Sequence, residues 1–391
     1  MNQQLISMRI AIFTGSPLTS FGGAERYAIW LANELIEHNV RVTIFSPVNN
    51  SQDNISISEL QDMCDAEIML FKTIPFKIIP FFPVFSAKNL KRLREVNTIY
   101  NIDESLFTGI FLSFYSRIRK ITYIYGMHIP ESFLFGNRSA QSNFKKKIWH
   151  IYRIPLLVFF KGFVRDIHII NKKQLESLRS IRFSGNIHLI SDAVYRKAEK
   201  IIFNDHEFMI LFSGVQSVDI KGIDLLVNII KITLQKETGV KFCITGGFGN
   251  GTALIDEMVS EHPYNIANKG FVSERELVQL SNEASLFITT SKIESFSLGI
   301  VGAQSYGLPC IAFNIPGPSD IIIKPLQGVL IDPFDTTKFA EAILRYYAMW
   351  KTNFEQFKLL RYTIQKNIYE TLGSEIIFPK ILNMLNNLRS Y

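Results

Sequence analysis

The sequence predicts an α/β protein with two Rossmann-like domains, each built on a parallel sheet. Short apolar runs alternate with longer segments of helical periodicity in both halves of the chain, a pattern typical of βα units that share one parallel sheet. The chain has 391 residues, which is long enough for two separate cores. A polar, charged stretch at 195–206 predicts the linker between them. We therefore expect domains at 1–194 and 207–373, followed by a terminal helix at 374–391.

Charge is distributed unevenly along the chain. The formal net charge is +7, and residues 1–200 hold 26 Lys and Arg against 16 Asp and Glu, whereas the remainder holds 16 against 19. The basic half is the one that we expect to meet an anionic partner. The three cysteines are scattered and odd in number, so they predict neither a disulfide framework nor a metal knuckle and fit a reducing compartment. No nucleic-acid-binding motif is present.

The N-terminus lacks the basic start, apolar core and cleavage site of a secretory signal. No run reaches the roughly 20 apolar residues that a membrane-spanning helix needs. We therefore expect a cytoplasmic protein that lies on a membrane if it meets one.

The first βα unit carries paired glycines. Residues 9–14 and 40–46 predict strands, and an apolar-periodic helix lies between them. Gly22 and Gly23 stand where the loop meets this helix. Glycines there let backbone N–H groups approach an anion, and a helix start favours negative charge. A bare tight turn is the alternative interpretation.

Aromatic and basic residues interleave at 71–94 and again at 144–163. One interpretation is an interfacial surface for anionic lipid. The other, for 71–94, is a core strand and loop followed by a basic, solvated helix. The recurrence of the pattern in the basic half favours membrane-surface contact.

A single histidine follows a strand in the first domain. Residues 121–125 predict the strand, and His128 comes just after it, level with the paired-glycine loop in a parallel sheet. A loop histidine taken alone is more often a surface residue than a catalytic one. The last strands of this domain are predicted at 166–171 and 187–191.

The second domain begins with a strand at 208–213, whose exit loop contains Gly214 and Lys221. A lysine just before a helix can reach a phosphate as a mobile point charge, although it can also be a solvated surface residue. The next strand, 241–245, leads into a glycine-rich loop around Gly247. No acid follows at the spacing of a dinucleotide-binding fingerprint, so we interpret this loop as flanking a nucleotide base.

A helix at 274–283 precedes the most informative stretch. A buried strand at 286–290 feeds a polar turn that holds Glu294, and a small-residue helix then runs to Gly307. A carboxylate at the carboxyl end of a parallel strand, beside a helix start, lies where open α/β sheets bind ligands. Another strand follows at 309–313.

The C-terminal region predicts three further elements. Residues 327–333 predict a hairpin-like turn and a strand, 337–347 a helix, and 375–388 a terminal helix that is apolar at helical spacing.

The stretch around Glu294 resembles the retaining GT-B glycosyltransferases related to family 4. Their fingerprint is a Glu, seven residues, a second Glu, a small-residue helix and Gly-Leu-Pro. Glu294 takes the first position, and Gly302 stands at the second. The other matching residues are Phe296, Ala303, Ser305, Gly307, Leu308 and Pro309. The resemblance extends to the Gly-Gly-Ala-Glu-Arg run that begins at Gly22 and to Lys221-Gly222, where Val215 replaces the arginine that the family usually has.

The resemblance implies a GT-B fold, in which two domains face each other across a cleft and the last helix crosses back onto the first domain. It implies transfer of a hexose or N-acetylhexosamine from a nucleotide-sugar, UDP-linked by expectation, with retention at the anomeric carbon and without a metal. The implied acceptor is a lipid-linked glycan or polysaccharide, such as lipopolysaccharide, built at the inner face of a bacterial-type cell membrane.

The resemblance also assigns roles to individual residues. The catalytic residues it implies are Glu294, His128 and Lys221. The donor-binding residues are Gly22, Gly23, Gly214, Lys221, Gly247, Phe271, Val272, Glu294, Phe296, Ser297, Leu298 and Gly302.

Two departures from the family pattern leave a second interpretation open. The family's second Glu grips the nucleotide ribose, and Gly302 has no side chain to do so. Loss of such a charge-assisted hydrogen bond removes roughly 1.5–3 kcal/mol. Val215 removes a phosphate contact as well. The alternative is a catalytically degenerate GT-B chain that serves as a binding or partner subunit.

Overall fold

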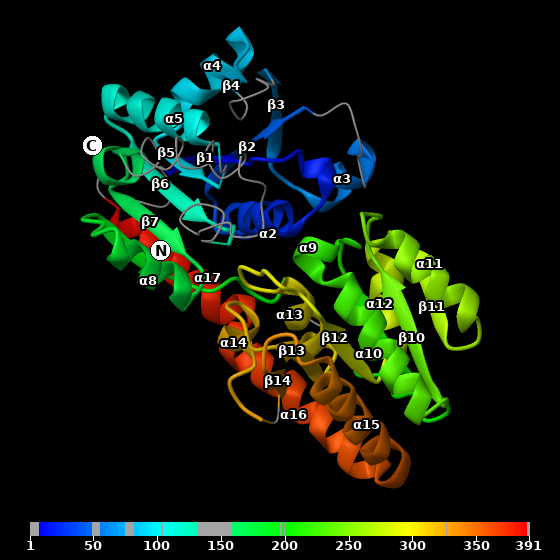
Figure 1. Ribbon diagram of the computed structural model, residues 1–391. Helices are drawn as coiled ribbons and strands as arrows, with labels where there is room; N and C mark the ends of the chain where they lie inside the picture. Colours follow the sequence, from blue (N-terminus) through cyan, green and yellow to red (C-terminus); the bar gives the residue numbers. More distant parts are fainter. Residues whose placement is uncertain are drawn as a thin grey trace. The chain divides into compact units, whose positions relative to one another are not determined.

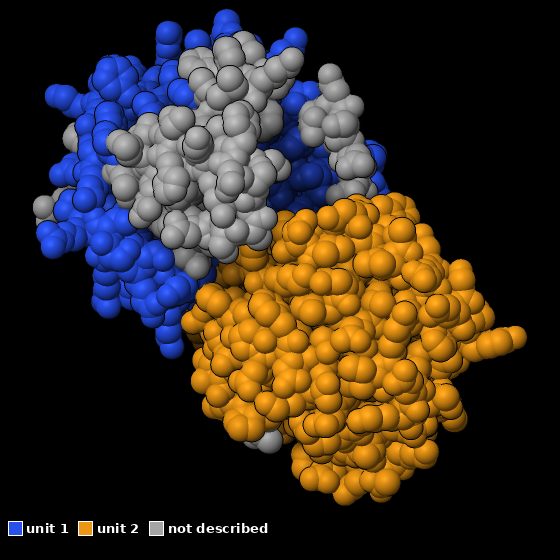
Figure 2. Space-filling view, viewed as in Figure 1, with its two compact units in different colours: residues 1–191, 377–391 blue, residues 192–376 orange. Residues whose placement is uncertain are grey.

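The computed structural model describes residues 8–48, 55–74, 82–102, 105–130, 158–195, 198, 200–325 and 327–388. The chain divides into two compact units, which Figure 2 colours separately. Unit 1 comprises Met1–Ser191 and Ile377–Tyr391, and unit 2 comprises Asp192–Ile376.

Unit 1 is built on an eight-stranded sheet with the order β4-β3-β2-β1-β5-β6-β7-β8 (Figure 1). Its strands are β1 (Arg9–Phe13), β2 (Arg41–Pro47), β3 (Glu67–Ile74), β4 (Phe82–Val84), β5 (Thr98–Asn101), β6 (Thr122–Met127), β7 (Asp166–Ile169) and β8 (Asn186–Leu189). Every neighbouring pair is parallel except β3 and β4, which are antiparallel. The strands expected from the sequence in this half are confirmed, and β4 is a three-residue edge strand that the sequence did not predict.

Short polar residues begin several helices of unit 1. These helices are η1 (Leu18–Ser20), α2 (Gly23–Glu37), α3 (Ile57–Met63), α4 (Ala87–Glu95), α5 (Leu106–Arg119) and α8 (Lys172–Ser180). The side chains of Ser56, Ser86 and Asn171 each accept a hydrogen bond from the N3 backbone of α3, α4 and α8 in a capping box.

The terminal helix α17 (Ser374–Asn387) contributes to unit 1 from Ile377 onward. The Phe378 ring packs on two residues of the α2 region, with its centroid 6.4 Å from Trp30 and 4.6 Å from His38. Ile381 and Leu385, which follow at helical spacing, are buried as well. The last segment of the sequence thus covers the first helix.

The basic helix that follows the core strand at 71–94 is present as α4. Residues 75–81 of the first aromatic and basic segment, and residues 144–157 of the second, lie outside the described residues. Within the part of the chain that the structure describes, no helix combines the length and apolar character needed to cross a bilayer.

Unit 2 is built on a wholly parallel six-stranded sheet with the order β11-β10-β9-β12-β13-β14. Its strands are β9 (Phe208–Ser213), β10 (Val240–Thr245), β11 (Ile266–Gly270), β12 (Leu286–Thr289), β13 (Cys310–Phe313) and β14 (Gly328–Ile331). Its helices are α9 (Val218–Lys221), α10 (Ile223–Lys236), α11 (Thr252–Glu261), α12 (Glu274–Glu283), α13 (Leu298–Ser305), α14 (Pro318–Ile321), α15 (Thr336–Thr352) and α16 (Phe354–Leu372). Figure 1 shows α10, α15 and α16 running along the sheet.

The hairpin-like turn expected before β14 is wrong. β14 pairs with β13 in parallel, and a parallel neighbour requires a crossover, here through the short helix α14. Gly328, within the segment expected to turn, starts the strand at φ +154°, where a Cβ would lie 2.0 Å from the Cys310 carbonyl oxygen. The glycine therefore marks a close approach between strands.

Residues 195–206, expected as a linker, lie within unit 2. A buried arginine of α16, Arg361, joins this segment to the core of the unit. Its guanidinium donates hydrogen bonds to the carbonyl oxygens of Ala284 (3.1 Å), Tyr306 (3.0 Å) and Ile202 (3.4 Å). It also lies over the Phe203 ring, 5.2 Å from the centroid. Burial lowers the pKa of Arg361 to about 9, so the side chain is still charged at neutral pH.

Candidate functional site

The point in the unit 2 sheet where strand order reverses carries the main candidate site. β9 and β12 are parallel neighbours, but the chain runs outward from β9 through β10 to β11 before it returns to β12. Ligands of open α/β sheets bind at such switch points, beyond the carboxyl ends of the strands. The exit loop of β9 contains Lys221 at the end of α9, and the exit loop of β12 contains Glu294.

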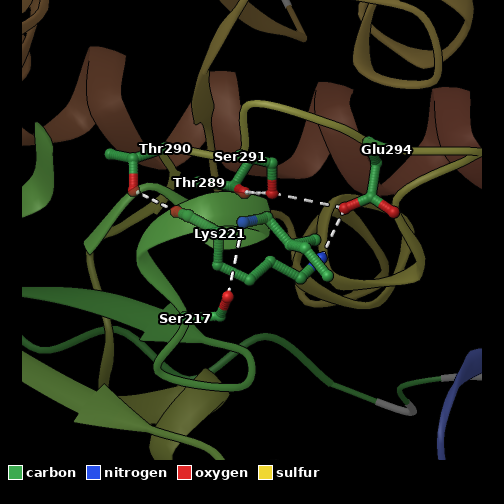
Figure 3. Close-up of polar contacts among 7 residues, drawn as sticks. Ser217, Lys221, Thr289, Thr290, Ser291 and Glu294 are labelled. Carbon is green, nitrogen blue, oxygen red and sulfur yellow. Dashed lines mark hydrogen bonds and ion pairs between the residues drawn. The ribbon is translucent and has the colours of Figure 1, made fainter. Parts of the chain in front are cut away.

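Lys221 and Glu294 form an ion pair at this point (Figure 3). Lys221 Nζ lies 2.5 Å from Glu294 Oε2, and their side chains are 24% and 14% exposed. Ser291 Oγ donates to the same carboxylate oxygen at 3.3 Å, and its own oxygen lies 3.0 Å from Thr289 Oγ1. A chain of hydroxyl groups thus orients the carboxylate from the strand side.

Hydrogen bonds to backbone carbonyl oxygens join the two exit loops. Thr290 Oγ1 donates to the Lys221 carbonyl oxygen at 2.8 Å, and the Lys292 N–H donates to the Ile220 carbonyl oxygen at 2.8 Å. Between them, Gly222 adopts φ +64°, and a Cβ there would lie 2.3 Å from the Thr290 carbonyl oxygen. Only glycine fits this position, so the loops can approach closely enough for the ion pair.

The start of α13 lies directly after Glu294. Ser297 takes the left-handed conformation at φ 84° and precedes the first helical residue, Leu298. Gly317, at φ +91°, packs against this turn, since its Cβ would lie 3.1 Å from the Phe296 backbone N and O. The first N–H groups of a helix have no partners within the helix and favour an anion. The turn therefore presents amide donors close to a lysine and a carboxylate.

Gly302 and Val215 occupy open positions in unit 2. Gly302 is exposed, and a Cβ built on it would meet no heavy atom within 4 Å. Val215 is 52% exposed. Gln304, the nearest amide side chain in the sequence, is buried and donates to the Gln327 carbonyl oxygen. A charged side chain would be tolerated sterically at position 302, and Gln304 does not substitute for one.

The exit loops of β10 and β11 form an apolar rim. Phe248 is 71% exposed and Phe271 is 38% exposed, and Val272 is half-buried beside them. A Cβ on Gly270 would lie 3.0 Å from the Phe248 ring, so Phe248 covers the end of β11. Sequence reasoning named Phe271 and Val272 and missed Phe248; an exposed aromatic residue within the glycine-rich loop was the available signal.

Two glycines allow the β9 and β10 exits to touch. Gly246 adopts φ +122°, where a Cβ would lie 2.0 Å from the Gly214 carbonyl oxygen. Gly214 in turn lies beside the Lys221 stem, with its Cβ position 3.5 Å from Lys221 Cδ. The next loop residue, Gly247, faces Val215, since a Cβ built on Gly247 would lie 4.0 Å from Val215 Cγ2. The predicted residues Gly214, Gly247 and Lys221 are therefore close in space.

A second group of candidate residues lies in unit 1. Gly22 caps α2 and Gly23 is its first residue, while His128 directly follows β6 and is buried. One turn into α2, the Tyr27 ring packs against the His128 ring with a centroid distance of 4.0 Å and an interplanar angle of 35°. The helix that begins at the paired glycines thus also supports the histidine.

Sequence reasoning missed two partners of His128. Tyr100 Oη lies 3.0 Å from His128 Nε2 and 2.5 Å from His168 Nδ1. His168 is fully buried, and Tyr100 is 1% exposed. The available signal was a polar ring at the third position of each of two short strands, β5 and β7.

The predicted residues thus fall into two groups: Gly22, Gly23 and His128 in unit 1, and all the others in unit 2. Across the residues that the structure describes, no cluster of three or more His, Cys, Asp or Glu side chains could hold a metal ion.

Comparison with known proteins finds similarity to glycosyltransferases in sequence. Residues 207–349 match the family described as Glycosyl transferases group 1. A poly(ribitol-phosphate) alpha-N-acetylglucosaminyltransferase of Staphylococcus aureus is 28% identical over 44% of this chain. This chain spans only 34% of that relative's length.

Two solved structures resemble the whole chain. TarM superposes with a TM-score of 0.74 at 14% identity, and 99% of this chain and 100% of TarM are covered. Anabaena HepE, solved with UDP and glucose, gives 0.74 at 15% identity, with 97% and 100% covered. The fold is GT-B, as the resemblance implied.

Proposed function

We propose that the protein is a glycosyltransferase that moves a hexose or N-acetylhexosamine from a nucleotide-sugar to a glycan acceptor. The observation that carries the proposal is the Lys221–Glu294 ion pair at the switch point of unit 2. It combines a cation for a diphosphate with a carboxylate that accepts hydrogen bonds from sugar hydroxyls. The family match over 207–349 supports the same reaction class.

The chemistry requires stabilisation of the leaving group. As the bond between the anomeric carbon and the diphosphate oxygen breaks, the ring gains positive charge and the diphosphate gains negative charge. Lys221 and the amide groups around Ser297 and Leu298 provide fixed positive charge and donors for that diphosphate. Glu294, held by Ser291, orients the sugar through its hydroxyl groups.

We propose UDP as the nucleotide carrier and retention as the stereochemical outcome. Anabaena HepE, which shares the fold, was solved with UDP and glucose, and the sequence around Glu294 resembles the fingerprint of retaining enzymes except at Gly302. The exposed Phe248 and Phe271 rings offer apolar surface for the base. For Gly22, Gly23 and His128, which lie in unit 1, the proposed roles in donor binding rest on the resemblance in sequence alone.

The proposed acceptor is a lipid-linked or polymeric surface glycan. The S. aureus relative is named for transfer to poly(ribitol-phosphate), an anionic surface polymer. The excess of basic residues in 1–200 suits an anionic acceptor or an anionic membrane at which a lipid-linked acceptor is held.

A surface of α4 and α5 supports peripheral binding to the inner face of an anionic membrane. Phe114 and Ile118 lie one turn apart on α5 and are 57% and 65% exposed. The exposed cations Arg119 and Lys120 follow them, and Arg119 donates to the Arg94 carbonyl oxygen at the end of α4. Apolar side chains beside clustered cations are typical of helices that lie in a lipid interface.

The double variant Phe114→Ser/Ile118→Ser is expected to bind vesicles of phosphatidylglycerol at least about tenfold more weakly, because each apolar side chain contributes roughly 1.5–3 kcal/mol when buried. Co-sedimentation with these vesicles measures the effect. Leu359→Ser, which removes a 67% exposed side chain from α16 in unit 2, is the control. Equal binding by the double variant and the control would exclude this surface as the membrane contact.

Gly302→Glu tests the donor site. Because position 302 has open space, the new side chain is expected to fit without disturbing the fold. Its carboxylate is expected to strengthen UDP binding by about ten- to a hundred-and-fifty-fold, by accepting hydrogen bonds from the ribose hydroxyls. Calorimetric titration with a panel of nucleoside diphosphates and their sugar conjugates measures the effect. Gly162→Glu is a matched control, since a Cβ at that exposed position in unit 1 also meets nothing within 4 Å.

The outcome also separates the two candidate functions. Binding of a nucleotide-sugar by the unchanged protein, followed by turnover, supports the transferase. A protein that binds no member of the panel until Glu is introduced at position 302 supports the partner-subunit alternative, which Gly302 and Val215 favour.

A further inference from the structure

Gln216 joins the ends of three strands in unit 2. Its backbone N–H donates to the Gly247 carbonyl oxygen at 2.8 Å, and its carbonyl oxygen accepts from the Gly251 N–H at 2.8 Å. Its side-chain Nε2 donates to Asn268 Oδ1 of β11 at 2.7 Å. Because β10 lies between β9 and β11 in the sheet, a residue that follows β9 reaches across β10 to make this contact. Gln216 is completely buried, so these contacts are shielded from water.

The loop that Gln216 holds, residues 246–251, is closely packed. A Cβ on Gly249 would lie 2.5 Å from the Gln216 carbonyl oxygen, and one on Gly251 would lie 2.7 Å from the first side chain of α10. Only glycine fits at such distances. Phe248 is the one aromatic residue of the loop and is 71% exposed. A closely packed backbone thus carries a single exposed ring.

Gln216 also holds the strand end on which the Phe248 ring lies. The ring covers Gly270 of β11, since a Cβ on Gly270 would lie 3.0 Å from Phe248 Cζ. The Gly270 N–H donates to Asn268 Oδ1 at 3.3 Å, and the same oxygen accepts from Gln216. One side chain therefore supports both the loop that carries the ring and the backbone beneath it. A planar ring that is held in this way and remains mostly exposed is suited to stacking on a nucleobase.

The same loop is joined to the helix that carries Lys221. Asn250 Oδ1 accepts from the Val218 N–H at 2.9 Å, and Asn250 Nδ2 donates to Asp219 Oδ2 at 3.1 Å. Both partners lie in α9, whose last residue is Lys221. The backbone segments that carry the Phe248 ring and the ammonium group are therefore parts of one hydrogen-bonded substructure.

We infer that Gln216 is a positioning residue that holds the Phe248 ring as a stacking platform for the nucleobase, at a fixed separation from Lys221. The inference rests on the proposed function, which places the diphosphate at Lys221. All the residues involved lie in unit 2. Because every base has an aromatic face, the platform recognises nucleoside diphosphates as a class and does not select one base.

The first test compares nucleotides with their diphosphate portion alone. Gln216→Met keeps an unbranched side chain of similar length but removes the Nε2 donor. Calorimetric titration of the full-length protein is expected to show about three- to tenfold weaker binding of UDP and GDP, the effect of one lost hydrogen bond. Binding of inorganic pyrophosphate is expected to be unchanged. Unchanged binding of UDP and GDP would overturn the inference, as would an equal loss for pyrophosphate.

A double variant tests whether Gln216 acts through the ring. Phe248→Ala is expected to weaken UDP binding roughly 5- to 150-fold, the effect of losing one stacked base. Because Gln216 then has no ring to position, the addition of Gln216→Met to Phe248→Ala is expected to cause no further loss. A second loss of about three- to tenfold in the double variant would contradict the positioning role.

Gln304→Met is the matched control for Gln216→Met. Gln304 is also completely buried in unit 2, and its Nε2 donates one hydrogen bond, to the Gln327 carbonyl oxygen at 3.1 Å. We expect this variant to bind UDP like the unchanged protein. An equal loss of UDP binding in the two variants would show that any buried amide of this unit has the same effect, and would overturn the inference.

Hydrogen exchange without ligand reads the loop itself. In Gln216→Met we expect faster exchange of the amides of residues 246–251 than in the unchanged protein or in Gln304→Met. Equal exchange in all three proteins would contradict the role of Gln216 in holding the loop. If the unchanged protein binds no nucleoside diphosphate, the proposed function fails, whereas the exchange rates still decide whether Gln216 holds the loop that carries Phe248.

Discussion

Replacement of Lys221 by alanine is expected to lower kcat/KM for the nucleotide-sugar by about 10²- to 10³-fold, the usual effect of removing one donor to a developing oxyanion. The loss follows from position. Lys221 Nζ meets Glu294 at the switch point of unit 2, so in the proposed reaction it is the cation nearest the departing diphosphate. Because that charge grows as the bond breaks, we expect kcat to fall more than donor affinity.

Lys292→Ala provides the matched control for this variant. Lys292 lies in the same exit loop as Glu294 and is 26% exposed, compared with 24% for Lys221, but its ammonium pairs with Asp224 at 2.8 Å. Both variants remove one positive charge from the same region, so long-range electrostatic effects are equal. Steady-state kinetics should separate them by at least about tenfold. Similar activity of the two variants would remove Lys221 from the mechanism.

Replacement of Arg361 by methionine is expected to lower the free energy of unfolding of unit 2 by roughly 3–6 kcal/mol. The methionine retains most of the apolar stem, but the carbonyl oxygens of Ala284, Tyr306 and Ile202 lose their donors. The hydrogen bond to Ala284 is buried, whereas those to Tyr306 and Ile202 are partly buried. A buried acceptor left without a partner costs about 1–3 kcal/mol. Burial of the charged guanidinium destabilises the folded protein, as the lowered pKa of Arg361 indicates. The methionine variant is free of this cost, so we expect the net loss to lie in the lower part of the summed range.

Urea denaturation of the full-length protein, followed by tryptophan fluorescence, measures this effect. Lys366→Met on the same helix is the control, because the Lys366 side chain is 75% exposed and its ammonium lies 3.8 Å from the Glu370 carboxylate. We expect the control to change stability by less than about 0.5 kcal/mol. Equal midpoints for the two variants would mean that the three carbonyl groups find water when the guanidinium is absent.

Much of the fold could be predicted because strands buried on both faces have a strong local signal. β9 and α12 begin and end at the expected residues, since an apolar run before Gly214 and the cap Ser273 define them locally. The course of the chain after β13 could not be predicted in the same way. Gly328 marks a contact with Cys310, and contacts between strands are not encoded in local turn chemistry.

For the candidate site, too, individual residues could be predicted from the sequence, whereas contacts between distant segments could not. Lys221 and Glu294 could each be named from its place at the end of a strand, but 73 positions separate them, so their ion pair depends on the strand order. Tyr100 and His168 were missed for a related reason. A polar ring on a short strand carries no local signal for its partner, and only the strand register around Gly126 of β6 brings the two rings together.

Order of synthesis gives the placement of α17 a further consequence. Unit 2 is one continuous stretch, Asp192–Ile376, whereas unit 1 needs Ile377–Tyr391 as well. During translation unit 2 can fold before unit 1 is complete, because Phe378, which packs on Trp30, is synthesised only after all of unit 2. Unit 1, although most of it is synthesised first, is therefore the last unit to complete its fold. A stop codon near the 3′ end would leave unit 2 complete and expose the hydrophobic surface of the other half to aggregation and proteolysis.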